Sequence, residues 1–270
     1  MKRAVFLVLS IVFFAKPLWA ERWHQVSAHR FGVIKSLLRS QGMATDDKGR
    51  FWFSSRQTLV RAKSPGGNAE KMNLLPFAKS LKARKANHIG DITYSNGVLF
   101  LPIEDGPKYN HPVIAKYNPE TLKAMAFYDL ERDWQPDGVP WVAADATSGS
   151  VFSSQYNNVT AINVYDYDTL KKVRQISMSE MIDSIQGAKY RDGSLYLSAD
   201  AKTKGKFAIY KLDLSTGHVE PVADLEDDLH EVEGLEFTGS GENLRLNVLG
   251  VAGSGFNRRV KFYEFEIAEK

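Results

Sequence analysis

The chain has 270 residues and a formal net charge of +3, from 35 basic and 32 acidic side chains. It contains no cysteine, which excludes disulfides, thiolate metal sites, a nucleophilic cysteine and a lipid-modified N-terminal cysteine. A chain of this length can bury a large core as one domain, so its stability has to come from that core.

The first twenty residues have the pattern of a secretory signal peptide. Two basic residues precede an apolar run over residues 4–15, and Ala20 offers a small side chain at the cleavage point. The run is shorter than the roughly 20 residues that a membrane span needs. We therefore predict a signal peptide over residues 1–20 and a single domain over residues 21–270, with no membrane span after cleavage. An exported chain without cysteines fits a bacterial protein that is periplasmic or secreted.

The charge balance of the mature chain argues against a polyanionic partner. The first twenty residues carry three basic charges, Lys2, Arg3 and Lys16, and no acidic one. Without these three, the 35 basic residues fall to the same number as the 32 acidic ones. We therefore expect no binding to nucleic acid. We expect the protein to be a monomer. Its expected partner is a small polar ligand or another protein.

From residue 41 onward, one pattern occurs five times: a strand start, a tight turn and a strand centred on a large apolar residue. The strand starts share an anchor position that recurs every 46 to 51 residues, at Gly42, Gly90, Trp141, Gly187 and Gly234. The strand centres are Trp52, Phe100, Phe152, Tyr196 and Leu246. A period of this size made of strands is typical of the blades of a β-propeller. We expect the strand centres to pack between neighbouring blades.

The second repeat shows the expected four strands of a blade most clearly. They are predicted at Ile89–Tyr94, Val98–Ile103, Pro112–Tyr117 and Lys123–Leu130. Asn96-Gly97 joins the first two, and this dipeptide supplies the positive φ angles of a tight hairpin.

The fifth repeat is one strand short before the chain ends. It offers only three strands, while the extended stretch Arg22–His29 precedes the first repeat. We infer that this stretch supplies the missing outer strand and closes the ring, which removes an exposed sheet edge. The predicted fold is an all-β, five-bladed β-propeller of four-stranded antiparallel blades, closed by an N-terminal strand that joins the last blade.

The candidate site lies where the first strand of each blade reaches one mouth of the central channel. The residue before the anchor is polar in three repeats, at Gln41, Gln186 and Glu233. Further candidates stand beside the anchors and in the adjoining loop of the second blade: His88, Asp91, Glu104, Trp141 and Glu231. Buried polar groups cost free energy unless they are satisfied, so such a ring favours water, an ion or a polar ligand.

These residues suggest three roles at this mouth. We expect a small polar ligand to contact Gln41, His88, Trp141, Gln186 and Glu231. Carboxylates of Asp91, Glu104 and Glu233 would suit Ca²⁺ or another divalent cation, because hard cations prefer oxygen ligands. For catalysis, one carboxylate, of Asp91 or Glu233, would serve as general base, with His88 as its partner or as an electrophile. The structural alternative is that the amides and carboxylates bond only to strand backbone and channel water.

The strand starts Gln41-Gly42-Met43 and Glu233-Gly234-Leu235 resemble those of two propeller families. One is the regucalcin and gluconolactonase group, and this resemblance implies a divalent cation in the channel and the opening of sugar lactones. The other is the glutaminyl cyclotransferases of plants and bacteria, which are five-bladed enzymes. The resemblance concerns the blades, extends over nearly the whole mature chain and implies that Glu233 is a channel acid.

Two functions follow from these observations. The first is an exported binding or scaffold protein with a polar ligand or a divalent cation at one channel mouth. The alternative is a metal-dependent propeller enzyme, a lactonase, hydrolase or glutaminyl cyclase-like protein, that uses channel carboxylates and a histidine. A protein partner would instead meet the loops near Tyr109 and Tyr156.

Overall fold

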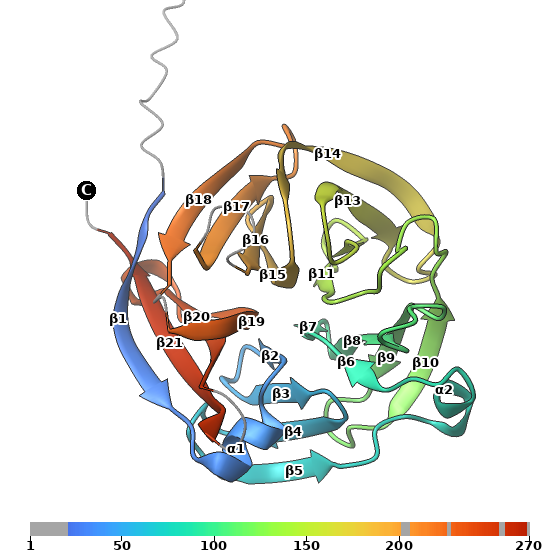
Figure 1. Ribbon diagram of the computed structural model, residues 1–270, viewed down its shortest axis with the longest axis horizontal. Coiled ribbons are helices and arrows are strands. Elements are labelled where there is room, and N and C mark those ends of the chain that lie inside the picture. The colour runs from blue at the N-terminus through green and yellow to red at the C-terminus, as the bar shows by residue number, and fades with distance from the viewer. Residues whose placement is uncertain (1–20, 201–205, 226–227, 254–256, 269–270) are drawn as a thin grey trace, which may run out of the picture.

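The computed structural model describes residues 21–200, 206–225, 228–253 and 257–268, so the predicted signal peptide lies outside the described residues. Five antiparallel sheets stand around a common axis, with one edge of each sheet at the centre (Figure 1). The prediction of an all-β, five-bladed propeller is confirmed.

In the first two blades the strands follow chain order from the axis outward. The first blade contains β2 (Gly42–Thr45), β3 (Phe51–Ser55), β4 (Thr58–Ala62) and β5 (Ala69–Asn73). The second contains β6 (His88–Ile89), β7 (Thr93–Ser95), β8 (Val98–Glu104), β9 (Val113–Tyr117) and β10 (Ala124–Asp129). The inner strand of this blade is divided, because β6 and β7 both pair with β8.

The next two blades repeat this order. The third contains β11 (Ala143–Asp145), β12 (Ser150–Ser153), β13 (Val159–Asp166) and β14 (Lys172–Ile182). The fourth contains β15 (Ile185–Arg191), β16 (Ser194–Ala199), β17 (Ala208–Asp213) and β18 (Val219–Asp224). Short helices α1 (Val33–Leu38), α2 (Lys79–Ala83) and η1 (Gly241–Asn243) lie in the connections. None of the helices in the described part of the chain could cross a membrane.

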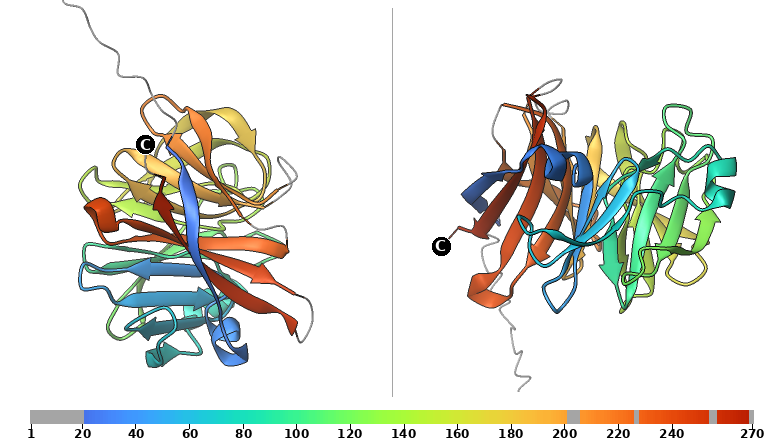
Figure 2. Two further views of the ribbon diagram at one scale, coloured as in Figure 1. Left: turned by 90° about the vertical axis from the view of Figure 1, so that its left-hand side faces the viewer. Right: turned by 90° about the horizontal axis from the view of Figure 1, so that it is seen from below.

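The two ends of the chain together build the fifth blade. Its inner strands are β19 (Leu229–Thr238), β20 (Arg245–Ala252) and β21 (Arg259–Ile267), and its outer strand is β1 (Trp23–Arg30). β1 runs antiparallel to β21, from Trp23 opposite Ile267 to Arg30 opposite Lys261. Figure 2 shows these first and last strands crossing the side of the ring together. The predicted closure is confirmed.

Tight turns of the expected type join the first two strands of the second and fourth blades. Asn96 and Gly97 have φ angles of 45° and 80°, and Asp192 and Gly193 have 48° and 78°. Two successive positive φ angles define the turn whose twist matches that of a β-hairpin. The residue types at these positions therefore fix the register of both hairpins.

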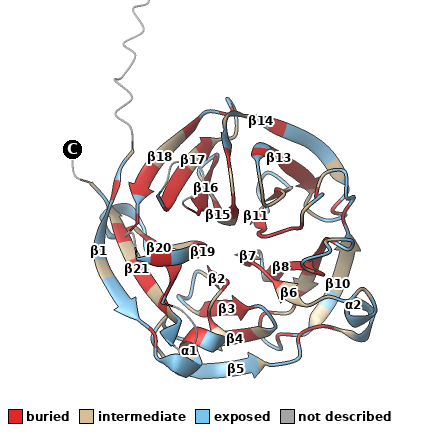
Figure 3. Cartoon of the chain, viewed as in Figure 1, coloured by how far each residue is buried: buried red, intermediate tan, exposed pale blue. Residues whose placement is uncertain are grey.

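The core consists of apolar contacts between neighbouring blades, and the inner strands are the most buried (Figure 3). The strand-centre aromatics meet aromatic residues of the following blade. Trp52 stacks on Tyr94 with ring centroids 5.1 Å apart, and Tyr196 meets Phe237 edge to face at 4.8 Å. Such pairs add about 0.5–1.5 kcal/mol beyond the burial of their area. The expected packing role of these residues is confirmed.

The anchor glycines are required by the close approach of the inner strands at the axis. A Cβ on Gly234 would lie 2.7 Å from the Cα of Gly42, and a Cβ on Gly90 would lie 1.8 Å from the carbonyl oxygen of Pro140. Both distances are shorter than any normal contact, so a side chain there would push two blades apart. The repeat of glycine thus reflects backbone contact between blades.

Candidate functional site

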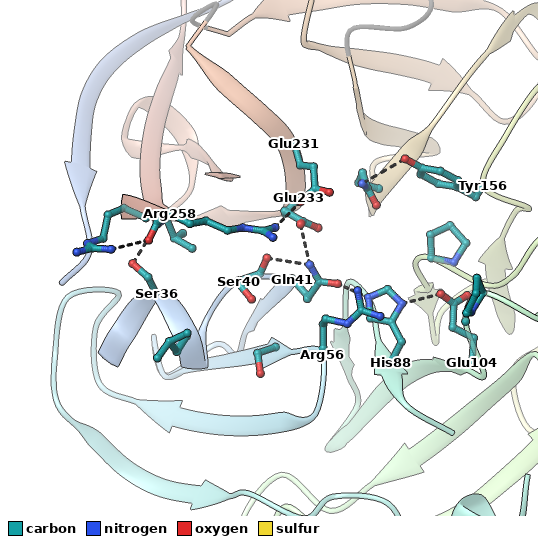
Figure 4. Close-up of a pocket in the computed structure, with 18 of the residues that line it drawn as sticks. Ser36, Ser40, Gln41, Arg56, His88, Glu104, Tyr156, Glu231, Glu233 and Arg258 are labelled. Carbon is teal, nitrogen blue, oxygen red and sulfur yellow. Dashed lines mark hydrogen bonds and ion pairs between the residues drawn. The ribbon is translucent and has the colours of Figure 1, made fainter. Parts of the chain in front are cut away.

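A cavity of about 740 Å³ opens at the end of the ring where the inner strands begin. Figure 4 shows its polar side chains converging from separate blades. Six of the side chains that line it are Gln41, His88, Glu104, Gln186, Glu231 and Glu233. All six were singled out in the sequence, and the structure brings them to this one cavity.

A line of four side chains crosses the cavity from the second blade to the fifth. Nδ1 of His88 lies 2.6 Å from Oε1 of Glu104, and Nε2 of the same ring bonds to Oε1 of Gln41. The amide nitrogen of Gln41 donates to Oε1 of Glu233 at 2.7 Å. Oε2 of Glu104 accepts the backbone N–H of Val139 at 2.8 Å. Three blades therefore hold one continuous hydrogen-bonded line.

The partners of Gln41 determine where the protons of this line must sit. Its amide nitrogen also donates to the carbonyl oxygen of Ser40 at 3.1 Å, so both of its acceptors fix the direction of the amide. Oε1 then faces His88 and has to accept, which places a proton on Nε2 of the ring. A second proton lies between Nδ1 and Glu104, because a ring nitrogen and a carboxylate oxygen at 2.6 Å need one to bond. The amide of Gln41 thus holds His88 and Glu233 in fixed positions by accepting from one and donating to the other.

A second polar group surrounds Asp200, which the sequence analysis did not single out. The side chains of Gln186 and Tyr156 both donate to its Oδ2 at 3.2 Å, and the backbone N–H of Val232 donates to Oδ1 at 2.9 Å. Nearby, the guanidinium of Arg258 pairs with Glu231 at 2.5 Å. Asp200 therefore fixes two side chains of the cavity wall from behind.

The missed residues Arg56 and Asp200 share a position with Glu104 and Tyr156 that the repeat could have disclosed. Four residues beyond the strand centre stand Arg56, Glu104, Tyr156 and Asp200 in the first four blades, while the fifth has Gly250. Three of these line the cavity, and Asp200 supports its wall. The signal was the end of the second strand in each blade, compared across all the repeats. Arg258 has no such signal, because it directly precedes β21 and lies outside this alignment.

Burial changes the acidity of two carboxyl groups at this mouth. Burial raises the pKa of Glu233 well above its usual value, and the carboxylates of Glu231 and Asp200 raise it further against the opposing charge of Arg258. Burial also raises the pKa of Asp200 to about 6, although the amide of Val232 opposes the shift. Glu233 thus keeps its proton to a higher pH than an exposed glutamate and can donate a hydrogen bond into the cavity.

Two of the predicted site residues lie outside this cavity. The indole of Trp141 is completely buried in the apolar cluster between the third and fourth blades. Asp91 is likewise 0% exposed and points to the axis below the cavity. Asp91 lies in the gap between β6, which ends at Ile89, and β7, which begins at Thr93, and it forms a parallel bridge with Trp141 of the third blade.

Asp91 instead connects the blades at the axis. Its carboxylate accepts the backbone N–H groups of Met43 and Ala188 and the ammonium of Lys189, each at 3.1 Å. Its backbone N–H donates to Pro140 at 2.9 Å. These contacts join it to the first, third and fourth blades from its own place in the second. These partners indicate that Asp91 has a structural role in holding the blades together.

The predicted metal ligands Asp91, Glu104 and Glu233 are not brought together. Glu104 and Glu233 occupy opposite ends of the line through His88 and Gln41. Across the described residues, no three His, Asp or Glu side chains form a group that could hold a metal ion. The geometry therefore favours hydrogen bonding over metal ligation at this mouth.

Comparison with known proteins identifies the fold. No family model and no curated protein sequence matches the chain. Among solved structures, a gluconolactonase from Xanthomonas campestris superposes with a TM-score of 0.56 at 14% identity, over 85% of this chain and 72% of that one. The tail fibre of Staphylococcus aureus phage P68 gives 0.51 at 15% identity, over 91% and 53%. Hydrazine synthase of Kuenenia stuttgartiensis gives 0.50 at 10%, over 82% and 58%.

These likenesses concern the fold. The chain spans little more than half the length of the tail fibre and hydrazine synthase chains that it matches. Proteins this distant share an architecture on which unrelated functions are built. The comparisons therefore establish that the chain has a propeller fold like that of the gluconolactonase, which agrees with the resemblance seen in its blades.

Proposed function

We propose that this protein is an exported binding protein that holds a small polar ligand in the cavity at the channel mouth. The observation that carries the proposal is the line from Glu104 through His88 and Gln41 to Glu233. It places fixed donors and acceptors in a cavity large enough for a small molecule. Fixing these groups in advance lowers the cost of ordering them when a ligand arrives.

Acid–base chemistry on the ligand is the second candidate. The raised pKa of Glu233 gives the cavity a carboxyl group that can supply a proton, and the imidazole of His88 lines the same cavity as a second acid–base group. The similarity of fold to a gluconolactonase makes a lactone a reasonable first substrate to assay. Hydrolysis that is lost in Glu233→Gln would favour this candidate over binding alone.

A thermal-shift screen tests the binding proposal. The panel contains sugars, polyols, amino acids, alkylamines and Ca²⁺, each with wild type and with Gln41→Met, which removes all three hydrogen bonds of the amide. A ligand present at 100 times its Kd stabilises the fold by about 2.7 kcal/mol. We expect at least one panel member to raise the Tm of wild type by several degrees, and this rise to disappear in Gln41→Met.

The matched control is Gln57→Met, which replaces an exposed glutamine in the turn between β3 and β4. It should keep the full ligand-induced rise in Tm. The proposal is wrong if no panel member stabilises wild type, or if the rise is the same in Gln41→Met and in the control.

A further inference from the structure

Exposed apolar side chains continue the cavity on one side. Val33, Ile34 and Leu37 of α1 are 52, 72 and 69% exposed, and Val33 and Leu37 also line the cavity. The residue that this helix buries is Ser36, so its apolar face is turned outward. A contiguous exposed apolar surface beside a polar pocket marks a place for an apolar group of a partner or ligand.

The opposite side of the cavity carries more acid than base. Glu231, Glu233 and Asp200 interact electrostatically with one another, and Arg258 is the cation paired among them. Glu233 is 2% exposed, and its hydrogen-bonded neighbour Gln41 is uncharged. A buried carboxyl group without its own cation gains the most from a ligand that brings one.

The other charged groups at the mouth have different partners or positions. His88 is paired with Glu104 on the far side of Gln41. Arg56 lines the cavity beside His88 (Figure 4) and is exposed, so water screens its charge. Asp137 and Arg259 also line the cavity: Asp137 accepts the backbone N–H groups of Tyr156 and Asn157, and Arg259 donates to the carbonyl oxygen of Arg258. The negative excess is therefore that of Glu233 and its neighbours Glu231 and Asp200 over Arg258.

We propose that the ligand is an amphiphilic amine, whose ammonium group binds beside Glu233 and whose hydrocarbon chain lies along Val33 and Leu37. The inference rests on the proposed ligand site and names the chemical class of its ligand. The same cavity contains both features, so one molecule satisfies them together: its cation balances the buried acid and its chain covers the exposed face of α1. A sugar or polyol would leave that apolar face in water.

Calorimetric titration with two matched ligand series tests both parts on the unmodified protein. One series runs from n-butylamine to n-octylamine, and the other contains the alcohols of equal length. We expect each amine to bind at least tenfold more tightly than its alcohol. Each added methylene should improve affinity roughly two- to fourfold, in keeping with the burial of hydrocarbon.

Two variants assign these effects to the cavity. Glu233→Gln keeps an oxygen acceptor for Gln41 and should reduce the preference for amine over alcohol to less than threefold, while Glu242→Gln on the exposed surface leaves it unchanged. Leu37→Ser should weaken octylamine at least fivefold and butylamine hardly at all. Leu74→Ser, at an exposed leucine that does not line the cavity, is its control.

The inference is overturned if amines bind no better than alcohols, if affinity does not rise with chain length, or if Glu233→Gln keeps the amine preference. Binding of sugars or amino acids under these same conditions would leave the proposed function standing. A screen without any ligand would remove both. Sedimentation showing a dimer that Leu37→Ser dissociates would assign the apolar face to a second copy of the chain and also overturn the inference.

Discussion

At the scale of single residues, Asp91 and Glu233 are both buried carboxyl groups, but they differ in their hydrogen-bond partners. Both carboxyl groups are buried on inner strands near the axis. Asp91 has an ammonium and two backbone N–H groups as partners, whereas Glu233 has one amide of Gln41 and lines a cavity. The first is satisfied within the protein, and the second can still interact with a ligand.

Replacing Asp91 should therefore affect the fold. Asp91→Asn leaves the buried ammonium of Lys189 without its carboxylate, and removing one partner of a buried ion pair typically costs about 3–5 kcal/mol. We expect a loss of this size in the free energy of unfolding, measured by urea denaturation. Ligand binding by the molecules that remain folded should keep its affinity.

The control is Asp192→Asn, at an exposed carboxylate whose pairing with Arg191 contributes little. It should change stability by less than about 0.5 kcal/mol. Normal stability together with lost ligand binding in Asp91→Asn would contradict the structural role and restore Asp91 to the site.

The sequence disclosed most of the candidate residues, and the exceptions have physical causes. Polar residues at strand starts were recognisable because the same position can be compared in five repeats, where an apolar residue is the ordinary choice. Asp91 stands one residue past an anchor, in the gap between β6 and β7, where its carboxylate bonds to other blades. The position of Asp200, four residues beyond a strand centre, recurs in the repeats, but its hydrogen bonds from Gln186 and Tyr156 behind the cavity wall become visible only in the structure.

At the scale of elements, the repeat predicts the strands, and the ends of the chain predict the closure. Four strands of a blade could be assigned because hairpin dipeptides and strand centres recur at fixed offsets. The short helices had no such support, since α1 buries only one of its residues completely against the ring and leaves its apolar face exposed. A helix whose apolar residues face outward does not show the apolar periodicity of an element that packs on the core.

Removing β1 tests the closure. A chain that begins at Phe31 lacks Trp23, whose indole is buried against Tyr196 and Phe237. It also leaves β21 as an unpaired edge, which can pair with other molecules. We expect a fall of more than 10 °C in Tm, together with concentration-dependent aggregation measured by light scattering.

Adding the peptide that corresponds to residues 21–30 should restore part of the lost Tm. A truncated chain that stays monomeric and keeps its full Tm would show that the ring does not need β1 for closure.

At the scale of the whole molecule, buried acids make stability depend on pH in an unusual direction. Burial raises the pKa of Asp91 to about 6 and that of Glu236 to about 7, each against the opposing charge of Lys189. Together with Glu233 and Asp200, these groups bind protons more tightly in the folded chain than in the unfolded one. Such a group contributes most below its unfolded pKa and loses its contribution as pH rises through the folded value.

We therefore expect the free energy of unfolding to fall as pH rises from about 4 to 7. The shift of Asp91 alone, from 3.8 to about 6, corresponds to about 3 kcal/mol, which is lost between those two pH values. Urea denaturation at pH 4, 5.5 and 7 measures the trend. Glu236→Gln removes one of the groups and should make the decline smaller.

Below pH 4, the carboxyl groups whose pKa is lowered in the folded protein determine how stability changes with pH. Hydrogen bonds from Ser215 and Thr216 lower the pKa of Asp213 to about 2, so its contribution is lost as pH falls toward that value. Stability should thus be greatest near pH 4. A maximum at pH 7 or above would show that the buried carboxyl groups are ionised in the folded protein without cost.

Backbone contact between Gly42 and Gly234 also has a kinetic consequence. Because there is no space for even a methyl group between these strands, a molecule in the cavity cannot pass between the first and fifth blades at this point. On this side of the axis it has to enter and leave through the mouth at which the cavity opens. A loop or partner that covers this mouth would slow the arrival and the departure of a ligand together, without changing any contact to it.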